Sequence, residues 1–179
     1  MSQSWKGKST IWLGKGSQNG KNIKIFAIDP HIGNIAHRKK HGAAQTFQEF
    51  QDNIQTAGLN DLVVPIVQTS EQAAADFTEP VEFIFIDGEH EYDFVKRDFE
   101  LWFPRVIDGG IMAFHDTSSW PGPFRVVAEN VYRSPYFKNI QTVDTITFAQ
   151  KVASNSSLER IRHRFLLFKR SFRAPTAPS

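Results

Sequence analysis

Two runs of apolar residues end abruptly in titratable side chains, and this pattern limits the folds open to the chain. FIFID occupies residues 83–87, and IMAFHD occupies residues 111–116. Short, continuous apolar runs that stop at turn-forming residues are typical of strands buried on both faces. Such strands occur where helices cover each side of a parallel sheet. We therefore expect parallel strands joined by helices.

Helical patterns separate these runs along the chain. Phe47, Phe50, Ile54 and Ala57 recur at spacings of three and four, which places them on one face of a helix. The predicted strands cover residues 24–29, 62–67, 81–87 and 111–116, and the predicted helices cover residues 46–58, 70–77, 91–103 and 125–134. Alternating strands and helices predict the α/β fold class, with a mainly parallel sheet.

Three local features refine this prediction. Ser70 is expected to cap the helix that follows it, and Asp108-Gly109-Gly110 is expected to form a turn. Two strands between residues 137 and 152, with Asp144 near their junction, predict an antiparallel hairpin at the carboxyl end of the fold.

Composition excludes several classes of protein. The chain has 179 residues, a net charge of +2 and no cysteine. It therefore cannot form disulfides or a thiolate zinc site, and its charge does not favour a nucleic acid as partner. No apolar run reaches the roughly 18 residues of a transmembrane helix, and the first residues lack the apolar centre of a secretory signal. We expect no transmembrane segment and a cytoplasmic location.

The titratable residues that follow the strands mark the expected site. In open α/β sheets, ligands bind just beyond the carboxyl ends of the strands. Asp29, Asp87, His115 and Asp116 lie at the carboxyl ends of predicted strands, and His90 follows one of them by three residues. The competing interpretation is that they are turn residues, since Asp-Gly is a common turn pair. Their repetition at three strand ends favours a ligand site.

A glycine near the amino terminus suggests a loop that approaches a ligand. Gly7 precedes a helical pattern, so backbone N–H groups could point at a bound molecule. Asp29 follows it by 22 positions, close to the ~20-residue gap at which an acid binds a ribose hydroxyl. The three-glycine fingerprint of nicotinamide enzymes is absent, but an NAD-dependent oxidoreductase on a Rossmann-like fold stays an alternative.

Three segments together resemble the small class I S-adenosylmethionine-dependent methyltransferases. They are SWKGKSTIWL, FAIDPH and FIFIDGEHEYDFVKRDFELWFPRVIDGGIMAFHD. The closest group includes macrocin-type and cephalosporin-type O-methyltransferases, and the resemblance covers roughly Ser4 to Val152. It implies a Rossmann-like sheet with helices on both faces and a domain over residues 1–152.

The resemblance also implies roles for individual residues. The loop that would cradle the methionine part of the cofactor contains Ser4, Trp5, Gly7, Ser9 and Thr10. Asp29 would accept hydrogen bonds from the ribose hydroxyls, and Ser70 and Glu71 would flank the adenine. Asp87 would lie near the sulfonium centre.

The chain departs from the family at its first residues. Relatives carry a strand ending in an E-x-G element before SWKGKST, whereas this chain has Met1, Ser2 and Gln3 there. We therefore expect the first central strand to be missing and the chain to be truncated or mis-started at its amino terminus. A non-catalytic, truncated binding protein with the same fold is an alternative function.

The strand-end residues suit methyl transfer to an oxygen. His90 is the candidate general base, because imidazole accepts a proton near neutral pH. The alternative interpretation is that His90 is a residue at the start of a helix that faces solvent. Asp87, His115 and Asp116 offer oxygen and nitrogen ligands for a metal ion such as Mg²⁺, and whether a metal is used is left open. Trp120 could wall the acceptor site or simply pack. The expected acceptor is a hydroxyl on a small molecule, a sugar-containing metabolite or a glycan.

The carboxyl-terminal segment is basic and apolar at helical spacing. Residues 153–173 predict an amphipathic helix, and residues 174–179 predict a disordered tail. The helix could dock on its own domain, lie on an anionic membrane surface or meet a partner. The oligomeric state is also left open, because an incomplete sheet can recruit a second chain.

Overall fold

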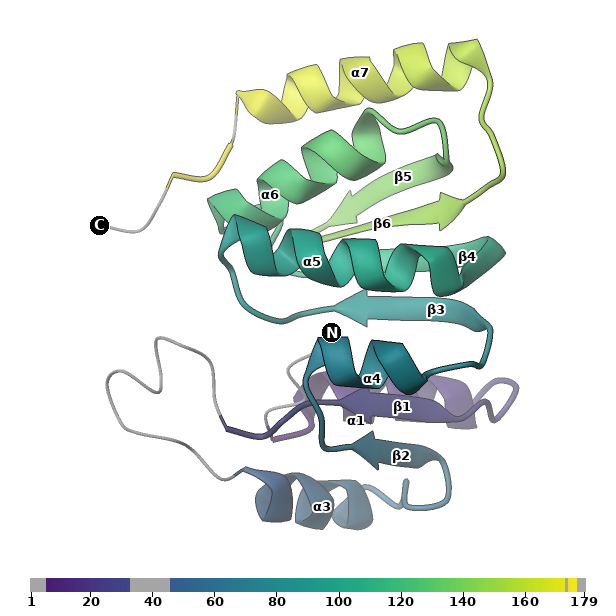
Figure 1. Ribbon diagram of the computed structural model, residues 1–179, viewed down its shortest axis with the longest axis vertical. Coiled ribbons are helices and arrows are strands. Elements are labelled where there is room, and N and C mark those ends of the chain that lie inside the picture. The colour runs from purple at the N-terminus through teal and green to yellow at the C-terminus, as the bar shows by residue number, and fades with distance from the viewer. Residues whose placement is uncertain (1–5, 33–45, 173, 177–179) are drawn as a thin grey trace. The chain divides into compact units, whose positions relative to one another are not determined.

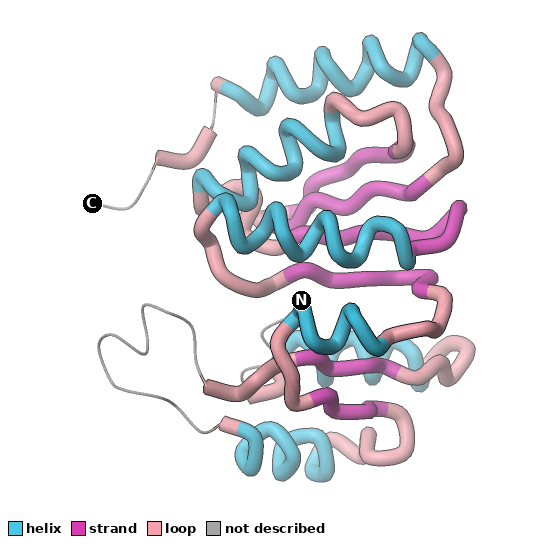
Figure 2. Tube along the Cα trace, in the orientation of Figure 1, coloured by secondary structure: helices cyan, strands magenta, loops and turns pink. Residues whose placement is uncertain are grey.

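The computed structural model describes residues 6–32, 46–172 and 174–176 (Figure 1). The chain divides into two compact units, one ending at Phe77 and one beginning at Thr78. We call them unit 1 and unit 2. Helices and strands alternate along the described residues, except where two strands follow each other in a hairpin (Figure 2), as the α/β prediction requires.

Among its described residues, unit 1 contains two parallel strands and three helices. Strand β1 (Ile25–Ile28) pairs with β2 (Val63–Ile66). The helices are α1 (Lys8–Gln18), α3 (Phe47–Thr56) and α4 (Ser70–Asp76). The core of the unit is a cluster of buried apolar side chains: Ala27, Phe50, Ile54, Leu59, Leu62 and Val63.

The helix starts of unit 1 follow from local chemistry. Gly7 precedes α1 with a φ of 89°, in the left-handed region that favours glycine. An added Cβ there would lie 3.2 Å from a ring atom of Phe50. The cap of α4 is Thr69 rather than the predicted Ser70, because the Thr69 hydroxyl accepts from Gln72 N while the Gln72 side chain accepts from Thr69 N. This reciprocal pair is a capping box.

Unit 2 contains a four-stranded sheet in the order β3-β4-β6-β5. The strands are β3 (Val81–Ile86), β4 (Val106–Phe114), β5 (Phe137–Val143) and β6 (Ile146–Lys151). Strands β3 and β4 are parallel, and β6 runs antiparallel to β4 and β5. The predicted hairpin is therefore present, and Asp144 takes a left-handed φ of 53° at its turn.

The helices of unit 2 enclose most of its buried apolar side chains. They are α5 (Tyr92–Trp102), the short η1 (Phe103–Arg105), α6 (Pro121–Val127), the π-helical η2 (Ala128–Tyr132) and α7 (Ser157–Ser171). Val95 and Phe99 of α5 meet Phe114 of β4 and Phe137 of β5 in one core cluster. No helix in the described ranges is long and apolar enough to cross a bilayer.

Two local predictions differ from the structure. Asp108-Gly109-Gly110 lies inside β4 rather than in a turn; Gly109 takes a φ of 90°, and the pairing register between β3 and β4 shifts beside it. Such a bulge uses the same residue types as a turn. Helix α6 begins at Pro121 rather than at the predicted residue 125, because proline suits the first position of a helix.

The described strands form two sheets. β1 ends the two-stranded sheet and β3 ends the four-stranded sheet, and no strand of the described residues pairs with both. The Rossmann-like fold class is otherwise confirmed.

Candidate active site

The candidate site of unit 2 lies at the carboxyl ends of two neighbouring parallel strands. Asp87 follows β3, and His115 and Asp116 follow β4. The backbone N–H of His115 donates to Ile86 O at 2.9 Å, which holds the two strand ends side by side. His90 lies in the turn that leads from β3 into α5. Sheet pairing thus brings together four residues that the sequence placed at strand ends.

The four side chains form a connected and half-buried group. His115 Nδ1 lies 3.2 Å from Asp87 Oδ1 and 3.0 Å from Asp116 Oδ2. The same Asp116 oxygen lies 3.0 Å from His90 Nε2. The side chains are 18% to 33% exposed, so each can meet a ligand while staying partly shielded from water.

Two carboxylates control the charge of His115. The contact with Asp87 is the main cause that raises the pKa of His115 to about 9, and the negative charge of Asp116 adds to it, while burial acts in the opposite direction. Nδ1 is buried and lacks a well-aligned hydrogen bond although both carboxylates are close. The site therefore concentrates negative charge around one buried nitrogen, and this charge favours a proton or another cation there.

His90 is oriented by a carboxylate and by an aromatic ring. Its Nε2 bonds to Asp116, which fixes the tautomer with the proton on Nε2 and leaves Nδ1 as an acceptor. The ring stacks on Trp120 with a centroid distance of 4.4 Å and an interplanar angle of 15°. The Trp120 side chain thus lies against the candidate base, where it can help to shape an acceptor site.

Asp116 is held by the backbone that surrounds it. It takes a left-handed φ of 57°, a conformation that Asp tolerates better than most residues. Its carbonyl oxygen accepts hydrogen bonds from Ser119 N at 3.1 Å and Trp120 N at 3.0 Å. The next residue, Thr117, is fully buried and bonds through its hydroxyl to Thr147 at 2.7 Å. These contacts fix the carboxylate that orients His90.

Contacts between α5 and the α6–η2 segment position the turn that carries His90. Tyr92 Oη donates to Glu129 Oε2 at 2.6 Å, and Arg125 Nε donates to Glu129 Oε1 at 2.9 Å. These bonds lower the pKa of Glu129 and raise that of Tyr92. Gly122, buried at the start of α6, lies so close that an added Cβ would overlap the carbonyl oxygen of His90. Sequence reasoning missed Gly122, Tyr92 and Glu129 as parts of the site.

Asp87, His115 and Asp116 also satisfy the geometry of a metal site. One ligand atom from each lies within 4.8 Å of the others. Two carboxylates and an imidazole suit a divalent cation with waters completing its shell. The buried Nδ1 of His115, which lacks an aligned hydrogen bond, is the atom that such an ion would satisfy. The residues present therefore fit the predicted metal.

The residues predicted to bind a cofactor lie mainly in unit 1. Gly7 precedes α1 and Asp29 follows β1. Asp29 is buried, and its Oδ1 accepts from His31 N at 2.6 Å. Ser70 and Glu71 begin α4 after β2.

The remaining predicted cofactor residues belong to α1, to unit 2 or to the part of the chain outside the described ranges. Ser9 lies in the first turn of α1, and Thr10, also in α1, is only 3% exposed. Ser4 and Trp5 lie outside the described residues. Asp87 belongs to unit 2.

The family match covers the segment that contains every one of these residues. Residues 4–117 match the family described as methyltransferase domain. The chain belongs to this family. The match spans the loop at Gly7, the strand end at Asp29, and the candidate metal ligands that follow β3 and β4. The resemblance to class I methyltransferases is therefore confirmed.

Solved structures of methyltransferases share this fold. The O-methyltransferase NovP is 17% identical, with a TM-score of 0.70 over 84% of this chain and 70% of its own. TomG from Streptomyces achromogenes, solved with S-adenosylmethionine, is 18% identical with a TM-score of 0.59 over 84% and 70%. An O-methyltransferase from Bacillus cereus, solved with S-adenosylhomocysteine, is 21% identical with a TM-score of 0.58 over 83% and 71%.

One curated protein matches this chain over a short segment. An uncharacterized protein of Sinorhizobium fredii, y4gI, is 43% identical over 37 residues, which are 21% of this chain and 4% of that protein. The match therefore spans a small fraction of that relative.

Proposed function

We propose that the protein transfers a methyl group from S-adenosylmethionine to a hydroxyl of a small molecule, a sugar-containing metabolite or a glycan. The pairing of His90 with Asp116 at the carboxyl end of the unit 2 sheet is the observation that supports it most. The family match and the cofactors bound to TomG and to the Bacillus cereus enzyme agree with this proposal.

His90 acts as the general base in the proposed reaction. The acceptor oxygen attacks the methyl carbon, the carbon–sulfur bond breaks, and S-adenosylhomocysteine leaves as a neutral thioether. The hydroxyl proton passes to Nδ1 of His90 while Asp116 keeps Nε2 protonated and oriented. A positioned base contributes typically about 10²–10⁴-fold to the rate. Trp120 stacks on one face of the imidazole ring.

Asp87, His115 and Asp116 hold a divalent cation such as Mg²⁺ in this proposal. A bound cation lowers the pKa of a hydroxyl that coordinates it. The carboxylates of Asp87 and Asp116 supply the negative charge, and His115 must lose its proton to serve as a ligand.

The cofactor contacts follow the family resemblance. The segment that includes Ser4, Trp5, Gly7, Ser9 and Thr10 binds the methionine part. Asp29 binds the ribose hydroxyls, as its place after β1 suits. Ser70 and Glu71 flank the adenine, and Asp87 lies near the sulfonium.

Methyl transfer from labelled S-adenosylmethionine to a library of hydroxyl compounds tests the function. We expect one acceptor class to be methylated, and we expect His90→Asn to lower kcat at least about 100-fold with little change in cofactor affinity. Asp116→Asn should also lower kcat. Asp93 is an exposed acid on α5, so Asp93→Asn serves as the matched control.

The alternative functions give different results in the same assay. A non-catalytic binding protein would bind S-adenosylmethionine and methylate no acceptor. An NAD-dependent oxidoreductase would bind NAD in preference to S-adenosylmethionine in a calorimetric titration. Either outcome would contradict the proposal.

A further inference from the structure

The outer surface of α7 carries an apolar stripe that methyl transfer does not use. Its members recur at spacings of three and four residues, which places them on one face of the helix. Their side chains are 56% to 79% exposed: Leu158, Ile161, Phe165, Phe168 and Phe172. A contiguous apolar patch of this kind is typical of a surface that binds a protein, a membrane or another ligand.

The opposite face of α7 is fixed to unit 2, so the stripe is presented outward. His163 is buried on that face, and Leu166 and Leu167 pack against the core of the unit. The Arg170 guanidinium donates to the hydroxyl of Thr147 at 2.7 Å and further anchors the helix. Helix α7 forms an outer layer of unit 2 (Figure 1). These contacts would have to break before the stripe could turn inward.

Cationic side chains border the stripe on both sides. At 3.6 residues per turn, Arg162 and Lys169 fall on one flank, and Arg160 and Arg164 fall on the other. All four are exposed. The one carboxylate of α7, Glu159, lies toward the anchored face, with Oε2 3.2 Å from Nε2 of buried His163 and Oε1 3.8 Å from a guanidinium nitrogen of Arg162. The stripe is therefore an apolar surface inside a positive border.

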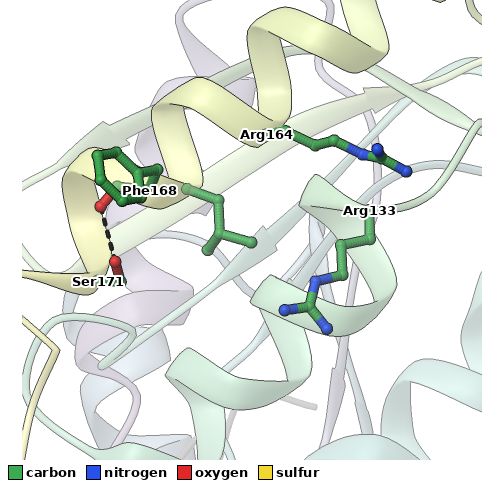
Figure 3. Close-up of a pocket in the computed structure, with 5 residues that line it drawn as sticks. Arg133, Arg164, Phe168 and Ser171 are labelled. Carbon is green, nitrogen blue, oxygen red and sulfur yellow. Dashed lines mark hydrogen bonds between the residues drawn. The ribbon is translucent and has the colours of Figure 1, made fainter.

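A hollow beside the stripe adds a second cationic feature. It has a volume of about 400 Å³ and is lined by Arg133, Arg164, Leu167, Phe168 and Ser171. Figure 3 shows Arg164 on α7 and Arg133 at the end of the neighbouring η2, which it follows in the chain. Two guanidinium groups beside an apolar surface suit the phosphate and the acyl chains of an anionic lipid.

We propose that α7 docks the protein on an anionic lipid membrane. The stripe inserts at the level of the headgroups, and the bordering cations contact lipid phosphates, as in other helices that lie in the membrane surface. A second copy is disfavoured as occupant, because an isologous contact between two α7 stripes would bring the same cations together. The inference goes beyond the proposed methyl transfer and does not depend on it.

Flotation of the full chain with lipid vesicles tests the proposal. We expect binding to vesicles of phosphatidylserine and phosphatidylcholine and none to vesicles of phosphatidylcholine alone. Raising the salt from about 0.1 M to about 1 M shortens the screening length from about 10 Å to about 3 Å and should release the protein. Arg162→Gln with Lys169→Gln should weaken binding about 25-fold, or about fivefold for each cation.

Matched variants separate the stripe from general effects of substitution. Phe165→Ser with Phe168→Ser should abolish binding, whereas Phe94→Ser, at an exposed phenylalanine of α5, should leave it unchanged. Lys21→Gln with Lys24→Gln is the control for charge. Arg133→Gln tests the hollow and should weaken binding severalfold. Circular dichroism of each variant confirms that it is folded.

Three results would overturn the proposal. The first is that the wild-type chain does not bind anionic vesicles at low salt. The second is equal binding by wild type and by the Phe165 and Phe168 variant. The third is a dimer in light scattering that this variant converts to a monomer, which would assign the stripe to a second copy.

Discussion

Replacing Gly122 with alanine should disturb the candidate active site through a backbone contact. The added Cβ would overlap His90 O and would lie 2.8 Å from Tyr92 N and 3.0 Å from Glu91 C. All three atoms belong to the backbone that leads into α5, so no side chain can rotate away. Either the start of α6 or the turn at His90 must therefore move.

The size of the effect follows from this overlap. Overpacking of this kind costs about 1–3 kcal/mol of folding free energy. A displacement of about 1 Å at a catalytic group can lower the rate about 10²-fold. At Gly16, an added Cβ would have no described atom within 4 Å beyond its chain neighbours and the backbone of its own helix, so the same substitution should instead stabilise α1 by about 0.5–1 kcal/mol.

Thermal unfolding and the kcat of methyl transfer measure the two effects separately. Gly122→Ala should lower both the Tm and the kcat measured well below the Tm, whereas Gly16→Ala should raise the Tm and leave kcat unchanged. A Gly122→Ala protein with the wild-type Tm and a kcat within twofold of wild type would refute the reasoning.

Three further predictions concern the charged groups of both units. The pKa of His115 is raised from 6.5 to about 9. Its protonated form therefore stabilises the fold fully below pH 6.5, and this contribution is lost as the pH rises through 9. The Tm should fall over this range, and it should fall by less in His115→Asn. Mg²⁺ should raise the Tm more at pH 9 than at pH 6, because it competes with that proton, and Asp87→Asn should remove this effect. Asp29→Asn should weaken S-adenosylmethionine binding about tenfold, or about 1.4 kcal/mol, in calorimetry; unchanged affinity would remove Asp29 from the cofactor site.

The parts of the fold that sequence predicted have strong local signals. Strands β3 and β4 follow from continuous apolar runs, and the hairpin follows from two short strands around Asp144. The meeting of Asp87 with His115 and Asp116 follows from a general rule, because parallel neighbours place their carboxyl ends together. These features needed no knowledge of long-range packing.

The parts that sequence did not predict depend on contacts between distant segments. Tyr92 and Glu129 are 37 residues apart and meet only because α5 packs on the α6–η2 segment. The stacking of Trp120 on His90 likewise depends on a loop conformation. Gly109 shows a different limit, since a bulge and a turn favour the same residues and only strand pairing decides between them.

The release of S-adenosylhomocysteine in the presence of a hydroxyl acceptor tests the central claim most directly. The proposed function predicts acceptor-dependent release by the wild-type chain and its loss in His90→Asn, with S-adenosylmethionine still bound by both proteins. Equal release by the two proteins would contradict the role of His90, and a wild-type chain that binds no S-adenosylmethionine would contradict the function itself.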